Sequence, residues 1–165
     1  MDGIAGEMKF DLEKKASVFL NMFYEKLGGE IIKDAPKQVF DDWDKIVKFE
    51  HITYKIEEKA RIGLWDDLLV ELIEDLKTGD LGWFYQTKAD KIIYSFFETE
   101  ESPEPKVIYA LSVIDMKQYV FSNMKELIME SRLSPKGYGL TLNVFIPLEL
   151  AKQIYPELPN RQVAQ

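Results

Sequence analysis

Residues 43–61 read WDKIVKFEHITYKIEEKAR, a stretch in which apolar side chains alternate with charged or polar ones. Such alternation is typical of strands that bury one face. A tight turn at Glu50 and His51 would divide the stretch into two antiparallel strands, with Phe49 opposite Ile52. We therefore predict a β-hairpin with His51 exposed at its tip and without a catalytic role.

The same register, continued outward, brings charged groups together on one face. It places Asp44 opposite Glu57, and Lys59 shares that face because side chains alternate along a strand. Opposed residues have Cβ atoms ~5 Å apart, so both carboxylates can bind one divalent ion, and oxygen ligands suit Mg²⁺ or Mn²⁺. Lys59 would contact the attacking water or a phosphate oxygen and stabilise the charge that develops there.

A simpler interpretation of this face stays open. Because 30% of the residues are charged, short Asp and Glu-x-Lys combinations also arise by chance. The face would then be a solvated hairpin surface, with cross-strand ion pairs worth less than about 1 kcal/mol each. The apolar pattern sets the register independently of the charges, and this favours the metal-site interpretation.

The order of these features resembles a known family. A helix near the N-terminus, then a hairpin with Asp44 on one strand and Glu57-x-Lys59 on the next, is similar to the PD-(D/E)XK, restriction-endonuclease-like superfamily, over roughly residues 8–97. Residues 82–94 also resemble segments that follow the active-site strands in phage-type members. The resemblance implies Mg²⁺-dependent hydrolysis of DNA phosphodiesters, with Asp44 and Glu57 as metal ligands and Lys59 as the catalytic lysine.

The resemblance leaves part of the ligand set open. Family members often place a further glutamate on the first helix, and Glu13 and Glu25 both qualify. The chain departs from the family pattern because Trp43 rather than proline precedes Asp44. The neighbouring carboxylates that compete with Asp44 as the first ligand are Asp41 and Asp42.

Residues 64–76 have two readings. Their leucine spacing slightly favours a helix, whereas the resemblance requires a strand over residues 67–74, which would bring Glu71 to the site. A second site is also conceivable at Gln86-x-Lys88 with Asp80 or Glu71, since some family members use Gln-x-Lys. The aromatic run Trp83-Phe84-Tyr85 is more typical of core than of a base-stacking platform.

The remaining pattern predicts one α/β domain, residues 1–165, with a central mixed β-sheet flanked by helices. Apolar spacing predicts a helix over residues 12–27 that ends at Gly28-Gly29. The other predicted elements are strands at 83–85, 91–97, 106–114 and 140–146, helices at 116–131 and 148–155, and a loop at 131–139.

Composition restricts the chemistry. The chain has no cysteine and one histidine, so any metal must be held by carboxylates. The net charge of −8 opposes phosphate binding, but residues 62–105 carry 11 acidic and 3 basic groups and the two ends are near neutral. Arg132 and Lys136, in the predicted loop, would suit phosphate contact, although the loop is more simply interpreted as an ordinary connector.

The sequence also sets expectations about partners and location. Residues 1–15 are too charged for a signal peptide, and no apolar run is long enough to cross a membrane, so we expect a cytoplasmic protein. The expected partner is DNA, and nucleases of this size often act as homodimers. The alternative function is a non-catalytic acidic protein that presents the carboxylates of residues 62–105 to a DNA-binding partner in place of phosphates. A third possibility is a nuclease fold whose activity has decayed and that now serves as a binding module.

Overall fold

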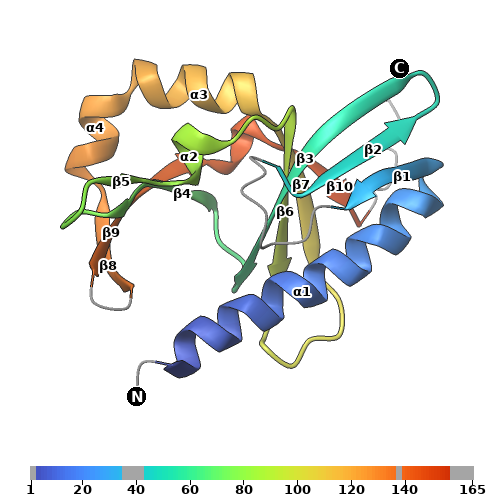
Figure 1. Ribbon diagram of the computed structural model, residues 1–165, viewed down its shortest axis with the longest axis horizontal. Helices are drawn as coiled ribbons and strands as arrows, with labels where there is room; N and C mark the ends of the chain where they lie inside the picture. Colours follow the sequence, from blue (N-terminus) through green and yellow to red (C-terminus); the bar gives the residue numbers. More distant parts are fainter. Residues whose placement is uncertain (1–2, 35–42, 137–138, 157–165) are drawn as a thin grey trace, which may run out of the picture.

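Two β-sheets share one core in the computed structural model, which describes residues 3–34, 43–136 and 139–156, with side chains from Leu12 onward except that of Lys136 (Figure 1). The six-stranded sheet has the order β1 (Gly29–Asp34), β2 (Lys45–Phe49), β3 (Ile52–Ile62), β6 (Lys91–Phe97), β7 (Val107–Ser112) and β10 (Lys152–Tyr155). The four-stranded sheet has the order β5 (Asp80–Leu81), β4 (Asp67–Asp75), β9 (Gly139–Pro147) and β8 (Arg132–Lys136).

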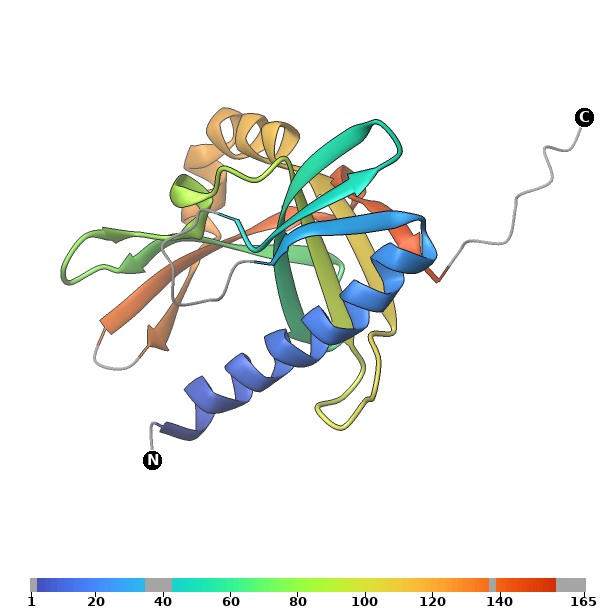
Figure 2. The same ribbon diagram turned by 45° about the vertical axis from the view of Figure 1, so that its right-hand side comes forward.

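Helices cover these sheets from different sides. The long α1 (Gly3–Lys26) crosses one face of the six-stranded sheet, as the turned view shows (Figure 2). The other helices lie by the four-stranded sheet: α2 (Trp83–Gln86), α3 (Val113–Ser122), α4 (Met124–Met129) and the 3₁₀ turn η1 (Leu148–Leu150). Since β3 and β6 are parallel and the other pairs antiparallel, the predicted mixed sheet flanked by helices is confirmed, with a second sheet added.

The predicted helix near the N-terminus is confirmed, and its spacing explains its position. Leu12, Ala16 and Leu20 recur every fourth residue and are buried against the sheet. Gly28 ends the helix with a φ of 81°, a left-handed conformation that glycine adopts without steric cost.

The hairpin register is also confirmed. Phe49 pairs with Ile52 and Val47 with Tyr54, while Lys45 pairs with Ile56, which sets Asp44 at the level of Glu57. His51 is exposed at the turn, as predicted. Lys45, Val47, Ile56 and Glu58 therefore face α1, whereas Glu57 and Lys59 face the second sheet.

Several elements differ from their predictions. Residues 64–76 are not helical: β4 is a strand in which Leu68, Val70 and Leu72 are buried at every second position. Two further corrections concern residues 83–85, which form the short helix α2 rather than a strand, and residues 131–139, where β8 replaces the expected loop.

The C-terminal half is more finely divided than predicted. The expected helix over residues 116–131 is two helices that meet at Asn123. Residues 148–155 are a 3₁₀ turn followed by β10 rather than one helix. The strand β1 was not predicted.

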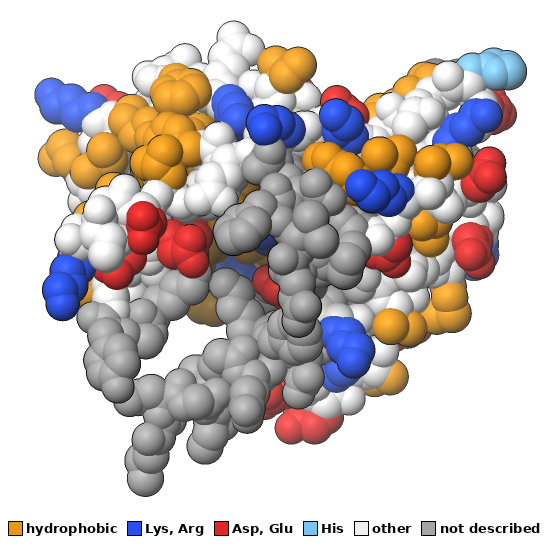
Figure 3. Space-filling view, in the orientation of Figure 1, with side chains coloured by type: hydrophobic (Ala, Val, Ile, Leu, Met, Phe, Trp, Pro, Cys, Tyr) orange, Lys and Arg blue, Asp and Glu red, His pale blue; other side chains and the backbone are white. Residues whose placement is uncertain are grey.

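Apolar side chains also remain on the surface, where they gather over α3 and α4 (Figure 3). They include Ile114, Phe121, Ile128 and Met129, with exposed fractions from 46% to 79%. In the part of the chain that the structure describes, no helix is both long and apolar enough to cross a membrane.

Candidate functional site

Asp44 is fixed against the neighbouring strand by two hydrogen bonds. Its backbone N–H donates to the carbonyl of Ile56 at 2.8 Å, which extends the β2–β3 pairing by one residue. Its carboxylate Oδ2 accepts from the backbone N–H of Glu58 at 2.6 Å. The Asp44 carboxylate, which we predicted from the sequence as a metal ligand, therefore lies directly beside the Glu57-x-Lys59 segment.

Glu57 and Lys59 form an ion pair on the face turned toward the second sheet. Lys59 Nζ lies 2.5 Å from Glu57 Oε1, and also 5.0 Å from the centre of the Trp83 ring. The Lys59 side chain is 20% exposed and that of Glu57 is 11% exposed. The pair is shielded from bulk water but still open on one side.

The charges of this site act on one another. Burial raises the pKa of the Glu57 carboxyl; Lys59 opposes the increase, Asp44 adds to it, and the pKa remains raised. Burial lowers the pKa of Lys59, but the negative charges of Glu57 and Asp44 outweigh it and leave the pKa raised. The charge of Glu13, on α1, raises both pKa values. The site therefore concentrates negative charge around one lysine.

The opposite face of β3 holds a separate ion pair. Lys45 Nζ lies 2.8 Å from Glu58 Oε2 and donates to the hydroxyl of Ser17. Tyr24 donates its hydroxyl hydrogen to Glu58 Oε1 at 3.0 Å. Lys45 is fully buried and Glu58 almost so, and among the described residues their side-chain partners Ser17 and Tyr24 belong to α1. This group ties α1 to the hairpin.

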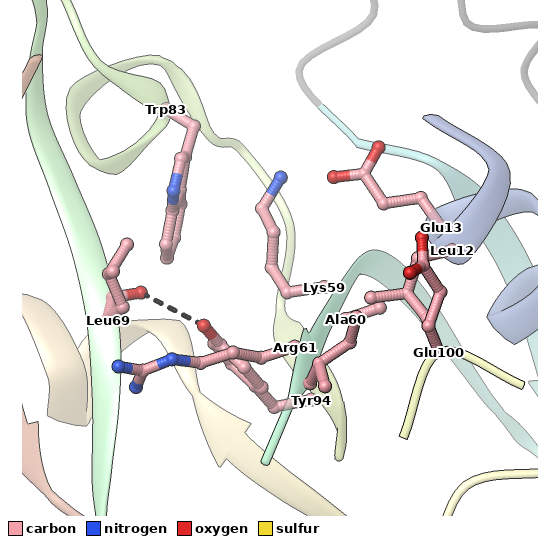
Figure 4. A pocket seen from close by; sticks show the side chains of 10 residues that line it. Leu12, Glu13, Lys59, Ala60, Arg61, Leu69, Trp83, Tyr94 and Glu100 are labelled. Carbon is pink, nitrogen blue, oxygen red and sulfur yellow. Dashed lines mark hydrogen bonds between the residues drawn. The ribbon is translucent and has the colours of Figure 1, made fainter. Parts of the chain in front are cut away.

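A pocket of about 370 Å³ adjoins the Glu57–Lys59 pair. Figure 4 shows Lys59 extending between Trp83 and Glu13, with Arg61 and Tyr94 below it. The rest of the lining is Leu12, Ala60, Ile62, Leu69 and Glu100. Since β2 pairs with β3 only as far as Ile56, the pocket reaches β3 where its edge lies beyond the hairpin pairing.

The donor set fits a divalent cation held by two carboxylates. Asp44 and Glu57 could supply oxygen ligands; the pKa of Glu57 is raised chiefly by burial, although Lys59 opposes the increase. Among the described residues, no group of three His, Cys, Asp or Glu side chains forms a metal site. Mg²⁺ does not require one, because it keeps several waters and uses one or two carboxylates together with substrate phosphate.

The structure separates the two glutamates of the first helix. Glu13 lines the pocket and its charge acts on Glu57 and Lys59, whereas Glu25 is exposed near the other end of α1. Asp41 and Asp42, the competing first ligands, lie outside the described residues.

The residues of the alternative Gln86-x-Lys88 site are distributed over a helix, a loop and two strands. Gln86 and Lys88 are exposed and lie on α2 and the following loop rather than on a strand, and Gln86 donates its amide to the carbonyl of Leu81. Asp80 accepts a hydrogen bond from the hydroxyl of Thr78 in the β4–β5 turn. Glu71 is buried on β4, opposite Asn143 of β9.

Comparison of this chain with family models, curated proteins and solved structures found no match.

A line of cations continues from the pocket to the second sheet. The Arg61 guanidinium lies 4.2 Å from the ring centre of Trp65 and 5.8 Å from that of Phe145, and it donates to Asp67. The exposed Arg132, on β8, lies 5.1 Å from the same Phe145 ring. Lys136 ends β8. Sequence reasoning missed Arg61, which lies two residues beyond Lys59 on β3, and Tyr94, which pairs with Lys59 in the parallel β3–β6 register.

Proposed function

We propose that the protein is a metal-dependent nuclease of the PD-(D/E)XK kind that hydrolyses DNA phosphodiesters at Asp44, Glu57 and Lys59. The observation that carries the proposal is the Lys59–Glu57 ion pair at 2.5 Å, formed at the strand level of Asp44 in the predicted register. These are the three groups that the resemblance implies for the active site. The N-terminal helix precedes the hairpin that carries them, and the resemblance implies this order as well.

In this proposal each side chain has a definite task. Asp44 and Glu57 would hold Mg²⁺ or Mn²⁺, and the bound ion would supply Lewis-acid activation of the phosphate and of a water. Lys59, whose pKa is raised above its ordinary value of 10.5, is protonated at neutral pH, so it can hold a phosphate oxygen as negative charge grows there. The Trp83 ring limits the positions open to Lys59 and excludes water from one side of it.

The surrounding charges support DNA as the substrate despite the net charge of −8. Arg61, which also pairs with Asp67, and Arg132 flank the Phe145 ring, so guanidinium groups continue from the pocket to β8. Arginines placed in this way can position a phosphate backbone without reading its sequence. Should the protein act as a homodimer, the exposed apolar side chains over α3 and α4 offer a surface for a second copy to bury.

The acidic-partner alternative receives less support. The acidic groups of residues 62–105 do not form one surface in the described structure: Asp67 is paired with Arg61 and Glu71 is buried. The others are divided, chiefly between the β4–β5 turn and the loop after β6. A protein that imitates DNA needs a continuous row of carboxylates.

A cleavage assay tests the proposal. Plasmid, linear duplex and single-stranded DNA are incubated with Mg²⁺, Mn²⁺ or EDTA and with the wild type, Lys59→Ala or Lys55→Ala. Lys55 is the matched control because it is an exposed lysine on the same strand. We expect metal-dependent cutting that falls about 100-fold or more in Lys59→Ala and persists in Lys55→Ala. No cutting of any substrate, together with no Mn²⁺ binding by calorimetry, would contradict the proposal.

A further inference from the structure

The pocket beside Lys59 is larger than a metal site requires. Its volume of about 370 Å³ lies within the range of small-molecule sites, roughly 300–1,000 Å³, and its lining is mainly apolar. One wall is formed by Trp83 and Leu69, and Tyr94 lies at its base (Figure 4). A flat aromatic ligand of moderate size matches these walls better than a phosphate or a bare ion does.

Polar groups lie at the pocket in the places that such a ligand needs. Lys59 and Arg61 supply positive charge for an attached phosphate, while Glu13 and Glu100 supply acceptors for amino groups. The Tyr94 hydroxyl donates to the carbonyl of Leu69 at 3.4 Å. Burial raises the Tyr94 pKa to about 12, so its ring forms a neutral surface throughout the neutral range.

From this arrangement we infer that the pocket binds one unpaired nucleobase adjacent to the phosphate that is cleaved. The inference rests on the proposed nuclease function and narrows its substrate to DNA with an unpaired nucleotide. A base within a duplex is covered by its neighbours on both faces, so it must leave the stack before it can contact Trp83. An extrahelical nucleotide, a single strand and a frayed end all offer the same base.

Binding measured in EDTA tests the inference without any cleavage. Three probes carry the fluorescent base 2-aminopurine: a single strand, a duplex in which this base is extrahelical, and a covalently closed duplex in which it is paired. Since stacking of one base on an aromatic side chain contributes about 1–3 kcal/mol, we expect the first two probes to bind at least about fivefold more tightly than the third. Their fluorescence should fall on binding as the base enters the pocket.

Three variants test whether the preference for unpaired probes depends on the pocket. Trp83→Leu removes the stacking wall, and Leu69→Trp fills the pocket from the same side; each should remove the preference for unpaired probes. Tyr85→Leu is the matched control, because Tyr85 lies on the same short helix but does not line the pocket. It should retain the preference. Thermal unfolding of each variant identifies any that fails to fold.

The outcomes separate the two proposals. Equal binding of paired and unpaired probes, or a preference that survives both Trp83→Leu and Leu69→Trp, would overturn the base pocket. Preferential binding without cleavage under any metal condition would uphold the pocket and overturn the nuclease. If the closed duplex is cut as fast as the bulged one, the nuclease stands and the base pocket does not. If the single strand binds more tightly than the closed duplex but the duplex with the extrahelical base does not, the pocket accepts bases from single strands or frayed ends and not extrahelical bases.

Discussion

Glu57 and Glu58 are neighbours on β3, yet their carboxylates lie on opposite faces of the sheet and each is paired with a different lysine. Glu57 contacts Lys59 at 2.5 Å on the pocket side, and Glu58 contacts Lys45 at 2.8 Å beneath α1. Asp44 joins the two environments, since its carboxylate accepts the backbone N–H of Glu58. One strand thus carries a structural pair and a candidate catalytic pair at adjacent positions.

The first prediction concerns the contribution of the buried Lys45–Glu58 pair to stability. Lys45→Met should lower the free energy of unfolding by about 3–5 kcal/mol, because it leaves the Glu58 carboxylate buried without its cation. The double variant Lys45→Met with Glu58→Leu should recover much of this loss, since both charges are removed together. Urea unfolding at neutral pH measures both changes.

A surface pair provides the comparison for that experiment. Lys106 and Glu98 lie 3.9 Å apart and are both about 60% exposed, so Lys106→Met should change the stability little. If Lys45→Met is as mild as Lys106→Met, the buried pair does not stabilise α1 against the hairpin.

The second prediction concerns the pKa values of the candidate site. Asp44→Asn should lower the pKa of Glu57 and of Lys59, because the Asp44 charge raises both. The amide oxygen of the new side chain can still accept the N–H of Glu58, so the strand geometry should persist. Side-chain NMR titration of the carboxyl and amino groups measures the shifts, and Asp90→Asn, outside this cluster, serves as the control.

The sign of the associated pH dependence follows from the raised pKa. A carboxyl whose pKa is higher in the folded state contributes stability below its ordinary value of 4.5, and this contribution is lost as the pH rises through the folded value. Asp44→Asn should therefore reduce the stability that is lost when Glu57 deprotonates as the pH rises. An unchanged Glu57 pKa in this variant would show that the two carboxylates do not interact.

The hairpin could be predicted because the alternation of apolar residues and the positions of the charged groups lead to the same strand register. Alternation puts Val47, Phe49 and Ile56 on one face, and the tight turn at Glu50 and His51 sets the register that aligns Asp44 with Glu57. Local pattern was sufficient because the two strands are adjacent in sequence and the turn between them is short.

Other elements could not be read from local pattern. β4 contains leucines at both helical and alternating spacing, and its pairing with β9, far along the chain, decides between them. β8 contains Pro135 and is followed by glycines, which are typical of a loop; an edge strand tolerates the proline because one side needs no hydrogen bonds. The pocket requires both sheets, so no single segment reveals it.

The third prediction distinguishes the two glutamates that the resemblance left open. Glu13→Gln should lower the pKa of Glu57 and reduce metal-dependent cleavage about tenfold or more, because Glu13 lines the pocket and its charge acts on the ion pair. Glu25→Gln removes an equal charge from an exposed position on the same helix and should change neither. NMR titration and the cleavage assay measure the two effects separately. Equal effects of both substitutions would indicate general electrostatics rather than a role at the site.

The last prediction concerns the glycine that positions Trp83. A Cβ atom at Gly82 would lie 2.3 Å from the backbone oxygen of Glu71, while the Gly82 N–H donates to the carbonyl of Leu72 at 2.8 Å. Gly82→Ala must therefore push α2 away from β4 and carry Trp83 out of the pocket wall. We expect a loss of about 1–3 kcal/mol in unfolding free energy and a weaker preference for unpaired DNA.

Fluorine NMR of protein labelled with fluorotryptophan measures this displacement directly. The Trp83 resonance should move in Gly82→Ala, whereas those of Trp43 and Trp65 should stay in place. Lys77→Ala, an exposed substitution in the nearby β4–β5 turn, is the control and should move none of the three. If the Trp83 resonance is unchanged while the protein is destabilised, the close approach of Gly82 to β4 contributes to stability alone. The pocket would then owe its shape to other contacts of α2.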